Sequence, residues 1–423
     1  MEKLKNKIKI ILHDKRLLKR IGFVILMLAA FRLLAAIPIP GIDAARLAQF
    51  LSTNQFFGIL NIFSGGGLSN LSIIMLGVGP FITASIIMQL LTLMVPRLKS
   101  LYQEEGEAGR KRFTQYSRLL TVPLAALQGF TLLIVLNRQG IIESFTPFAI
   151  AVNLIVIIAG SILLMWIGEL ISEYGIGNGV SLIIFAGIVS QMPREISQLI
   201  FSYDPSQIPI YILFAVVAFV MIAGVVMVTE AERPIPVTYA KQVRGSRVSG
   251  GTSTYIPLRI NQAGVIPIIF ALAILLFPQL LGNLLATSTN GFLHQASTVL
   301  LSFTQGSVAY GIAYFVLVFL FTYFYTAVTF DPHTMAENLQ KGGAFIPGIR
   351  PGQATEEYVG TIVTRITLLG ALFLGFVAVL PLIMQAISGI TTIAIGGTAL
   401  LIVVSVIIDL LKKIDAQVSM REY

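Results

Sequence analysis

Residues 208–228 read IPIYILFAVVAFVMIAGVVMV, an apolar run without a charged residue. A helix of about 20 such residues can cross the hydrocarbon core of a bilayer. The whole chain has the same character, because 56% of its 423 residues are hydrophobic and only 12% are charged. A soluble domain of this size needs more charge to cover its surface. The sequence therefore predicts an integral membrane protein with many spanning segments.

Nine further runs have a similar length and composition. A helix satisfies its own backbone polar groups in lipid, so we expect each run to be helical. The first run follows a lysine-rich stretch, as a secretory signal does, but it ends in IPIPG at 37–41 instead of a small-residue cleavage site, and we interpret it as a retained helix. The predicted spans are 21–37, 71–95, 116–136, 148–168, 180–200, 208–228, 261–281, 308–328, 361–383 and 391–411.

Basic residues are distributed unevenly between the two sides of these spans. If the N-terminus is cytoplasmic, the outside segments hold only Arg46, Arg138 and Arg194 of the 29 lysines and arginines. Loops rich in Lys and Arg stay on the cytoplasmic side. We therefore expect both termini to be cytoplasmic.

Two of the predicted cytoplasmic loops, 229–260 and 329–360, are long and basic. The first is expected to form two β-like stretches around a Gly/Ser-rich turn that carries Arg244 and Arg247. The second carries Arg350 between turn-forming residues. Long loops on one face usually have a function. Anchoring at the membrane surface by basic residues is the simpler alternative.

Ten spans divide into two sets of five, which gives halves 1–205 and 206–423. With five helices in each half, equivalent helices run in opposite directions. Two such halves with one fold are related by an axis in the membrane plane, as in inverted-repeat transporters. The number of spans permits this repeat but does not establish it.

The segment 55–70, QFFGILNIFSGGGLSN, lies between the first two spans. Phe56, Ile59, Leu60 and Phe63 have helical spacing and give one apolar face. The helix is too short to span, and the glycines 65–67 after it are expected to act as a flexible hinge. We favour a re-entrant plug over a helix lying on the membrane surface, since irregular backbone at membrane depth is tolerated inside protein.

Two further segments are distinctive. Residues 72–91 read SIIMLGVGPFITASIIMQLL, in which Ile82 and Ile86 lie four apart on one stripe that an ordinary bundle would use as core. Residues 166–185 read WIGELISEYGIGNGVSLIIF, with glycines suited to a tight turn. The chain has neither a dinucleotide fingerprint nor a P-loop. Energy must therefore come from a partner or from the membrane potential.

Candidate groups for chemistry are scarce. The chain has no cysteine, and its three histidines are far apart, so we expect no metal and no cofactor. Arg32 is the one clear charge inside a predicted span. Such charges are functional candidates, but Arg32 lies near the outer helix end, which favours snorkelling to the interface. An enzyme such as an intramembrane protease needs Ser/His or two Asp at membrane depth, and a coupled solute transporter needs strongly polar ligating groups there. Neither set is present.

The segments 72–91 and 166–185 resemble the two signature segments of the SecY family, the channel subunits of the bacterial Sec protein translocase. Similar stretches extend along nearly the whole chain, at 31–41, 56–69, 260–271, 345–352 and 396–404. The resemblance implies an all-α membrane protein with ten transmembrane helices in two pseudo-symmetric five-helix halves and a short re-entrant plug helix at about 55–67. It implies a channel and no enzyme activity. A secondary solute transporter with inverted repeats is the alternative.

The resemblance also implies roles for particular residues. A hydrophobic pore ring is expected at Ile82, Ile86, Ile184, Ile188, Ile269 and Ile402. The plug is expected to include Phe56, Phe57, Ile59, Leu60, Ile62 and Phe63. A lateral gate, between the second and third helices and the seventh and eighth, is expected to use Thr83, Ser85, Gln128, Asn261 and Gln262 as a polar latch. Motor or ribosome docking is expected at Arg244, Arg247 and Arg350.

Family members work with SecE and usually SecG, with the SecA motor ATPase or the ribosome, and with signal peptides and unfolded preproteins. The resemblance therefore implies these partners and a place in the bacterial inner (plasma) membrane.

Overall fold

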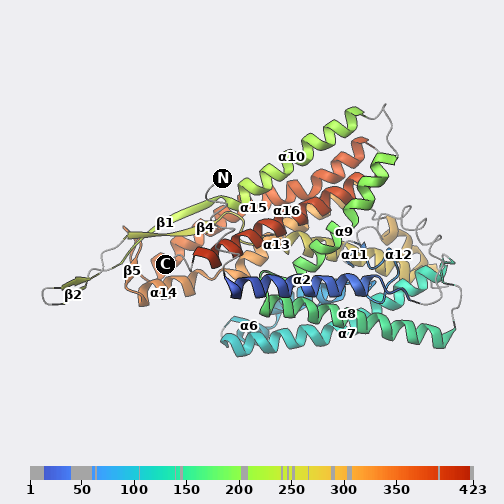
Figure 1. Cartoon of the computed structure of the whole chain (residues 1–423). Helices are drawn as coiled ribbons and strands as arrows, with labels where there is room; N and C mark the ends of the chain where they lie inside the picture. The colour runs from blue at the N-terminus through green and yellow to red at the C-terminus, as the bar shows by residue number, and fades with distance from the viewer. Residues whose placement is uncertain are drawn as a thin grey trace.

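The computed structural model is mostly helical and describes these residues: 14–39, 60–61, 64–103, 105–138, 140–142, 146–201, 208–239, 242–244, 247–249, 253–264, 266–286, 291–302, 307–388 and 391–419. In Figure 1 the helices lie side by side in two groups, one coloured blue to green and one lime to red. A β-ribbon, formed by the strands at Glu232–Tyr239, Gln242–Arg244, Arg247–Ser249 and Ser253–Arg259, extends beyond the helices at one end.

The N-terminal half contains α2 (Lys15–Ala35), α5 (Gly79–Met94), α6 (Pro96–Gln103), α7 (Gly106–Arg138), α8 (Pro147–Tyr174) and α9 (Gly179–Phe201). The C-terminal half contains α10 (Ile208–Glu230), α11 (Ile266–Leu285), α12 (Gly291–Ser302), α13 (Val308–Thr329), α14 (Pro332–Lys341), α15 (Gln353–Ser388) and α16 (Thr391–Ser419).

Each of the ten predicted spans coincides with one of these helices, namely α2, α5, α7, α8, α9, α10, α11, α13, α15 and α16. In the described part of the chain, six helices are long and apolar enough by themselves to cross a membrane. A seventh is reached if α5 and α6, which meet at a bend of 111°, form one broken span.

The second span differs from its prediction, because its first residues are not helical. Residues 64–78 form turns that are mostly buried, and α5 begins only at Gly79. Leu71 and Gly77 have positive φ angles of 40° and 61°, which a helix cannot contain. The turns are hydrogen-bonded to the chain after α2, where Ile73 N donates to Ile37 O. The seventh span likewise begins its helix later, at Ile266.

The β-like stretches predicted in loop 229–260 are confirmed. Strand β1 (Glu232–Tyr239) pairs antiparallel with β4 (Ser253–Arg259), and β5 (Ala344–Phe345) joins the other edge of β1. Between them, β2 (Gln242–Arg244) and β3 (Arg247–Ser249) form a second, separate hairpin. Side chains of the larger sheet pack on the start of α15, in a cluster that includes Ile235, Val237, Leu258, Val359 and Ile362.

Helix α12, in the loop between α11 and α13, packs on α11. A Cβ added at Gly282 of α11 would lie 3.0 Å from Leu301 Cγ and 3.1 Å from Leu300 Cβ. Figure 1 places α12 at the end of the bundle opposite the β-ribbon. The loop between α11 and α13 is therefore partly an ordered cover for one end of α11.

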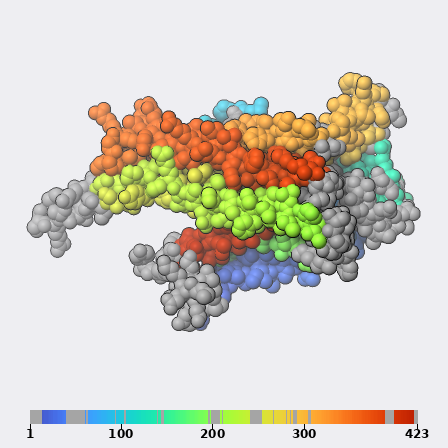
Figure 2. Space-filling view, turned by 90° about the horizontal axis from the view of Figure 1, so that it is seen from above, coloured from blue at the N-terminus to red at the C-terminus, as the bar shows by residue number. Residues whose placement is uncertain are grey.

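Several helices present apolar side chains on the outer surface. Figure 2 shows α10, in lime, as a band on the surface of the molecule. Ile212, Phe219 and Met227 of α10 are 60%, 72% and 74% exposed. Because lipid tails rather than water surround a spanning helix, such a face is compatible with a membrane protein. Helix α10 is apolar on every side, so the periodicity of its sequence could not distinguish the face toward the core from the face toward lipid.

Candidate functional site

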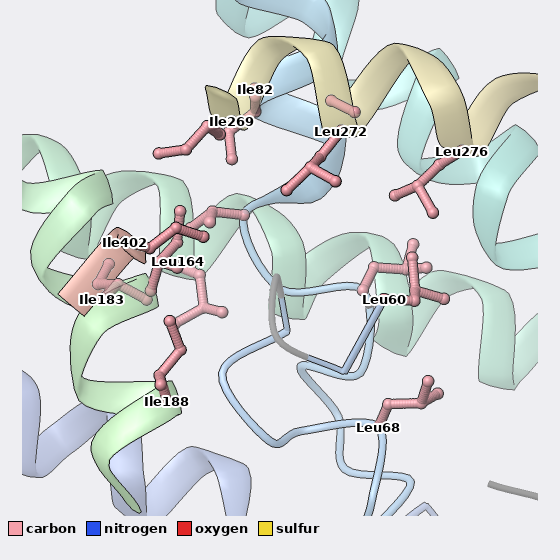
Figure 3. Close-up of a cluster of buried hydrophobic side chains, with 14 of the residues drawn as sticks. Leu60, Leu68, Ile82, Leu164, Ile183, Ile188, Ile269, Leu272, Leu276 and Ile402 are labelled. Carbon is pink, nitrogen blue, oxygen red and sulfur yellow. The ribbon is translucent and has the colours of Figure 1, made fainter. Parts of the chain in front are cut away.

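The six isoleucines predicted to form a ring lie in one buried cluster. They come from α5, α9, α11 and α16, and none exposes more than 4% of its surface. Figure 3 shows Ile82 of α5 beside Ile269 of α11, and Ile402 of α16 beside Ile183 of α9. The four helices are far apart in sequence, so only the fold brings these side chains together.

Other apolar side chains extend this cluster beyond the predicted ring. Leu272 and Leu276 follow Ile269 along one face of α11 at helical spacing, and both are buried. Leu164 of α8 and Ile183 of α9 face Ile402 in Figure 3. The spacing on α11 was a usable sequence signal. Leu164 carried no comparable signal, since α8 is apolar on every side.

Two adjoining cavities lead to the isoleucine cluster. They measure about 220 and 190 Å³ and share Asn178, Ser181, Ile266 and Tyr325 in their walls, so together they form one vestibule. The larger cavity is polar and charged, with Arg259, Asp409, Lys412 and Lys413 in its lining. The smaller one ends on the buried ring at Ile82 and Ile269.

The vestibule thus has charged side chains in its larger part, and its smaller part, where Ser85 and Gln89 are also in the wall, reaches the ring at Ile82 and Ile269. Its mouth lies on the side of the β-ribbon, because Arg259 ends β4. At the mouth, Lys412 Nζ donates a hydrogen bond of 2.6 Å to Thr229 O at the end of α10. The charged residues of the vestibule line its larger cavity, and none lines the smaller cavity beside the ring.

The predicted gate residues do not form one latch. Thr83 and Gln128 line a cavity of about 20 Å³, which is room for about one water molecule. Ser85 lines the inner vestibule instead, and Asn261 and Gln262 line its mouth. The side chain of Asn261 closes the turn before α11, donating to Gly264 O at 3.2 Å and accepting from Gly264 N at 2.9 Å.

The small cavity nevertheless marks a seam between the two halves. One wall comes from α5 and α7, with Gly79, Ile82, Thr83 and Gln128, and the other from α11, with Ala273, Leu276 and Phe277. Leu60 also lines this cavity and is 5% exposed. Figure 3 shows Leu60 pointing toward the α11 side chains.

The far end of the same seam carries a polar contact. Arg138, the last residue of α7, donates from Nη1 to Ala286 O just after α11, at 3.3 Å. A cation at this position also interacts favourably with the C-terminal end of a helix dipole. The contact joins a helix of each half at the end away from the vestibule.

Of the predicted plug, only Leu60 belongs to the residues described, together with its neighbour Asn61. Phe56, Phe57, Ile59, Ile62 and Phe63 lie outside the described residues. The glycine run that follows is not the loose hinge expected from the sequence, since Ser64–Gly67 are all buried. Gly65 and Gly66 have φ angles of 63° and 85°. A Cβ at Gly65 would lie 2.3 Å from Phe31 Cζ, so these glycines permit close packing rather than freedom.

The predicted docking arginines lie on the β-ribbon side of the molecule. Arg244 and Arg247 are paired in register at the tip of the β2–β3 hairpin. Arg350 is exposed just before α15, and its carbonyl accepts a 2.9 Å hydrogen bond from Thr355 Oγ1. Arg350 is therefore held in place by the first turn of α15 while its side chain faces outward.

A histidine–glutamate pair joins α14 to α15 beside Arg350. Nδ1 of His333 lies 2.9 Å from Oε2 of Glu356. This hydrogen bond, and then the negative charge of Glu356, raises the pKa of His333 above its ordinary 6.5. The contact is complete below the ordinary pKa and is lost as the pH rises through the raised value.

We expect an NMR titration of histidine-labelled protein to place the pKa of His333 above 6.5. In the Glu356→Gln variant, which keeps a polar partner without the charge, the pKa of His333 should fall back toward 6.5. A His333 that titrates at the same pH in both proteins would contradict the pairing.

Comparisons with known proteins agree with the resemblance seen in the sequence. A family model described as SecY matches residues 72–411. The chain is similar to the protein translocase subunit SecY of Thermus thermophilus, at 44% identity over 97% of this chain and 95% of that protein. It is also similar to the protein translocase subunit SecY of Synechocystis, at 42% identity over 96% of this chain and 92% of that one.

Solved structures are similar in fold. One is described by its SecY plug domain, which stabilises the closed state of the translocation channel and maintains a membrane seal. It matches with a TM-score of 0.69 and 21% identity, over 96% of this chain and 93% of that chain. Sec61 from a canine ribosome–channel complex matches with a TM-score of 0.59 and 20% identity, over the same shares of 96% and 93%. This likeness supports the ten-helix channel architecture.

Proposed function

The chain belongs to the SecY family, and we propose that it passes unfolded polypeptide through the vestibule and releases hydrophobic segments sideways through the seam. The observation that carries this proposal is the vestibule itself, which runs from Arg259, Lys412 and Lys413 to the buried ring at Ile82 and Ile269. A coupled solute transporter needs charged ligating groups at the inner end. No residue that lines the smaller cavity is charged.

The isoleucine cluster is the pore ring of this proposal. Ile82, Ile86, Ile184, Ile188, Ile269 and Ile402 are all buried in one cluster. Flexible apolar side chains around a narrow gap exclude water and ions by dewetting. They offer a passing peptide no hydrogen bond or charge, so the peptide is not held. The driving force must then come from outside the chain.

The seam between α5 and α7 on one side and α11 and α13 on the other is the proposed lateral gate. It lies between the halves 1–205 and 206–423. The apolar side chain of Leu60 fills the seam beside Thr83 and Gln128. Opening the seam therefore removes packing from one side of the plug, which loosens the plug when a signal peptide docks. Polar side chains within a membrane bundle contribute only about 0.6 kcal/mol per hydrogen bond, so such a seam can open reversibly.

The β-ribbon face is the proposed docking site for a motor or a ribosome. Two structural relatives are described as complexes with ribosomes, one canine and one from yeast. Arg244 and Arg247 at the hairpin tip and the exposed Arg350 would meet such a partner, since RNA phosphates favour arginine. This face would then be cytoplasmic, as would both termini, in a bacterial plasma membrane. SecE, SecG, SecA and preproteins are the proposed partners.

Crosslinking to a stalled substrate tests the pore. The chain has no cysteine, so single cysteines can be introduced at Ile82 and Ile269 without background. With a secretory polypeptide arrested during translocation, both positions should crosslink to it, because both lie at the inner end of the vestibule. The yield is measured after chemical crosslinking in membranes.

The control is a cysteine at Phe219 of α10, which is 72% exposed on the outer surface. It should crosslink to lipid-exposed neighbours and not to the arrested chain. Crosslinks at Phe219 together with none at Ile82 or Ile269 would place the path elsewhere and reject the pore.

A further inference from the structure

We propose that Arg32 of α2 and Gln191 of α9 form a polar seat that holds the plug segment on the N-terminal half of the protein, independently of the seam. The inference rests on the proposed channel function. It assigns a positioning role to two residues that no sequence pattern marked as part of the plug machinery.

Arg32 reaches the glycine run directly. Its Nη1 donates a 3.0 Å hydrogen bond to Gly65 O. Its guanidinium also lies 5.9 Å from the ring centre of Phe31, the side chain that packs against Gly65. The sequence favoured snorkelling for this residue. In the structure a cation of α2 is instead engaged with the backbone of the turn that follows the plug.

Gln191 holds the other side of the same turn. Its Oε1 accepts a 2.9 Å hydrogen bond from Asn61 Nδ2. Its Nε2 lies 3.3 Å from the place where a Cβ of Gly66 would be, and Arg32 Nη1 lies 3.6 Å from that place. The two seat residues therefore converge on one short stretch of backbone, from two helices of the same half.

Asn61 transmits this hold to the plug. Its Oδ1 accepts from Ser69 N at 2.9 Å, and its carbonyl accepts from Gly66 N and from Ser64 Oγ. Asn61 is 7% exposed. One buried side chain thus joins the end of the plug to the turn 64–69 and to α9, so that moving Asn61 moves all of them.

The hydrogen bonding of the seat is incomplete, so its hold on the plug segment is weak. Within the part of the chain that the structure describes, the buried Nε2 of Gln191 has no hydrogen-bond acceptor. A buried donor without an acceptor costs stability, so the network is less than fully favourable. A weak hold suits a segment that must leave the pore whenever a polypeptide enters.

Leu60 and Asn61 face opposite halves. Leu60 packs in the seam against Leu276 and Phe277 of α11, whereas Asn61 bonds to α9. When the seam opens, Leu60 loses its partners and Asn61 keeps its own. The plug segment then keeps its contacts with Arg32 and Gln191 on the N-terminal half. We infer that this retention limits ion leak while a hydrophobic segment passes sideways.

The test measures the resting ion conductance of reconstituted channels carrying Gln191→Met. Methionine keeps helix propensity and size but cannot accept from Asn61. The leak should rise between about threefold and about tenfold, the range that hydrogen bonds in membrane proteins imply. Arg32→Met should leak in the same range. Gln191→Glu, which keeps an acceptor for Asn61, should stay as tight as the unmodified protein.

Ser190→Ala is the matched control. Ser190 precedes Gln191 on α9, but its Oγ bonds within the helix to Gly187 O, so its loss should leave the conductance unchanged. Asn61→Ala also removes the bond from Ser69 N, so it should leak by itself, but it should raise the leak less in Gln191→Met than in the unmodified protein, where the bond between the two side chains is still present. A Gln191→Met channel no leakier than Ser190→Ala, or effects of Asn61 and Gln191 that simply multiply, would overturn the seat.

Deleting 56–67 separates this inference from the channel itself. If the deletion leaks and Gln191→Met does not, the seat is wrong and the channel stands. If neither leaks, both fail.

Discussion

Replacing Gly187 of α9 by alanine should make the resting channel leak ions. A Cβ at this position would lie 2.1 Å from Gly65 Cα and 3.1 Å from Gly65 O. Both are backbone atoms, so no side chain can rotate away to make room. The turn at Gly65 must therefore move. The side chain of Arg32 must then move with it, or its hydrogen bond to Gly65 O is lost. Overpacking of this kind costs about 1–3 kcal/mol, which shifts a closed–open equilibrium by about fivefold or more.

The control for Gly187→Ala is Gly311→Ala on α13. A Cβ at Gly311 would meet Val379 Cγ1 at 3.8 Å, an ordinary contact. Both changes gain about 1 kcal/mol of helix propensity, so only the clash differs between them. Single-channel recording in planar bilayers should find Gly311→Ala tight and Gly187→Ala leaky. Equal conductance of the two variants would mean that the glycine run does not seal the channel.

Joining the two walls of the seam should stop both translocation and lateral insertion. Thr83 of α5 and Ala273 of α11 line the same cavity of about 20 Å³ from opposite sides. With a cysteine at each position, a short bifunctional thiol crosslinker should tie the halves together. The chain has no other cysteine to compete. Since substrate can pass only when the walls separate, transport in vesicles should fall by about tenfold or more, the limit being set by crosslinking yield.

The matched pair for this experiment is Thr83→Cys with Gln128→Cys. Both residues line the same cavity, but they belong to α5 and α7 on one wall. Crosslinking them should leave transport at the level of the unlinked variant. A cleavable linker should restore transport through the Thr83–Ala273 pair. Normal transport with that pair fully crosslinked would exclude the seam as the gate.

The spanning helices could be predicted from the sequence because apolar length is a local property. Residues 208–228 predicted α10 to within a few residues of Ile208–Glu230. The start of α5 could not be found in the same way. Residues 71–78 are as apolar as a helix, but Leu71 and Gly77 take positive φ angles that depend on contacts with the chain after α2.

Only part of the candidate site could be predicted from the sequence, because the other contacts depend on residues far apart in the chain. Resemblance to a family pointed to the isoleucines, and all six are buried together. Gln191 escaped notice because its partner, Asn61, is 130 residues away in sequence. The resemblance grouped Asn261 with Thr83 and Gln128 as a polar latch, whereas in the structure its side chain closes a local turn. Polarity by itself does not specify a partner.

The contact of Arg138 with Ala286 makes the seam unequal at its two ends. One end of α11 is tied to α7 through this arginine, and the other end begins at Ile266, in the wall of the vestibule hollow. Helices of this length are about 30 Å long, so the tie acts far from the hollow. If this contact persists while the seam opens, the two walls separate most at the vestibule end of α11, which is where a hydrophobic segment would enter.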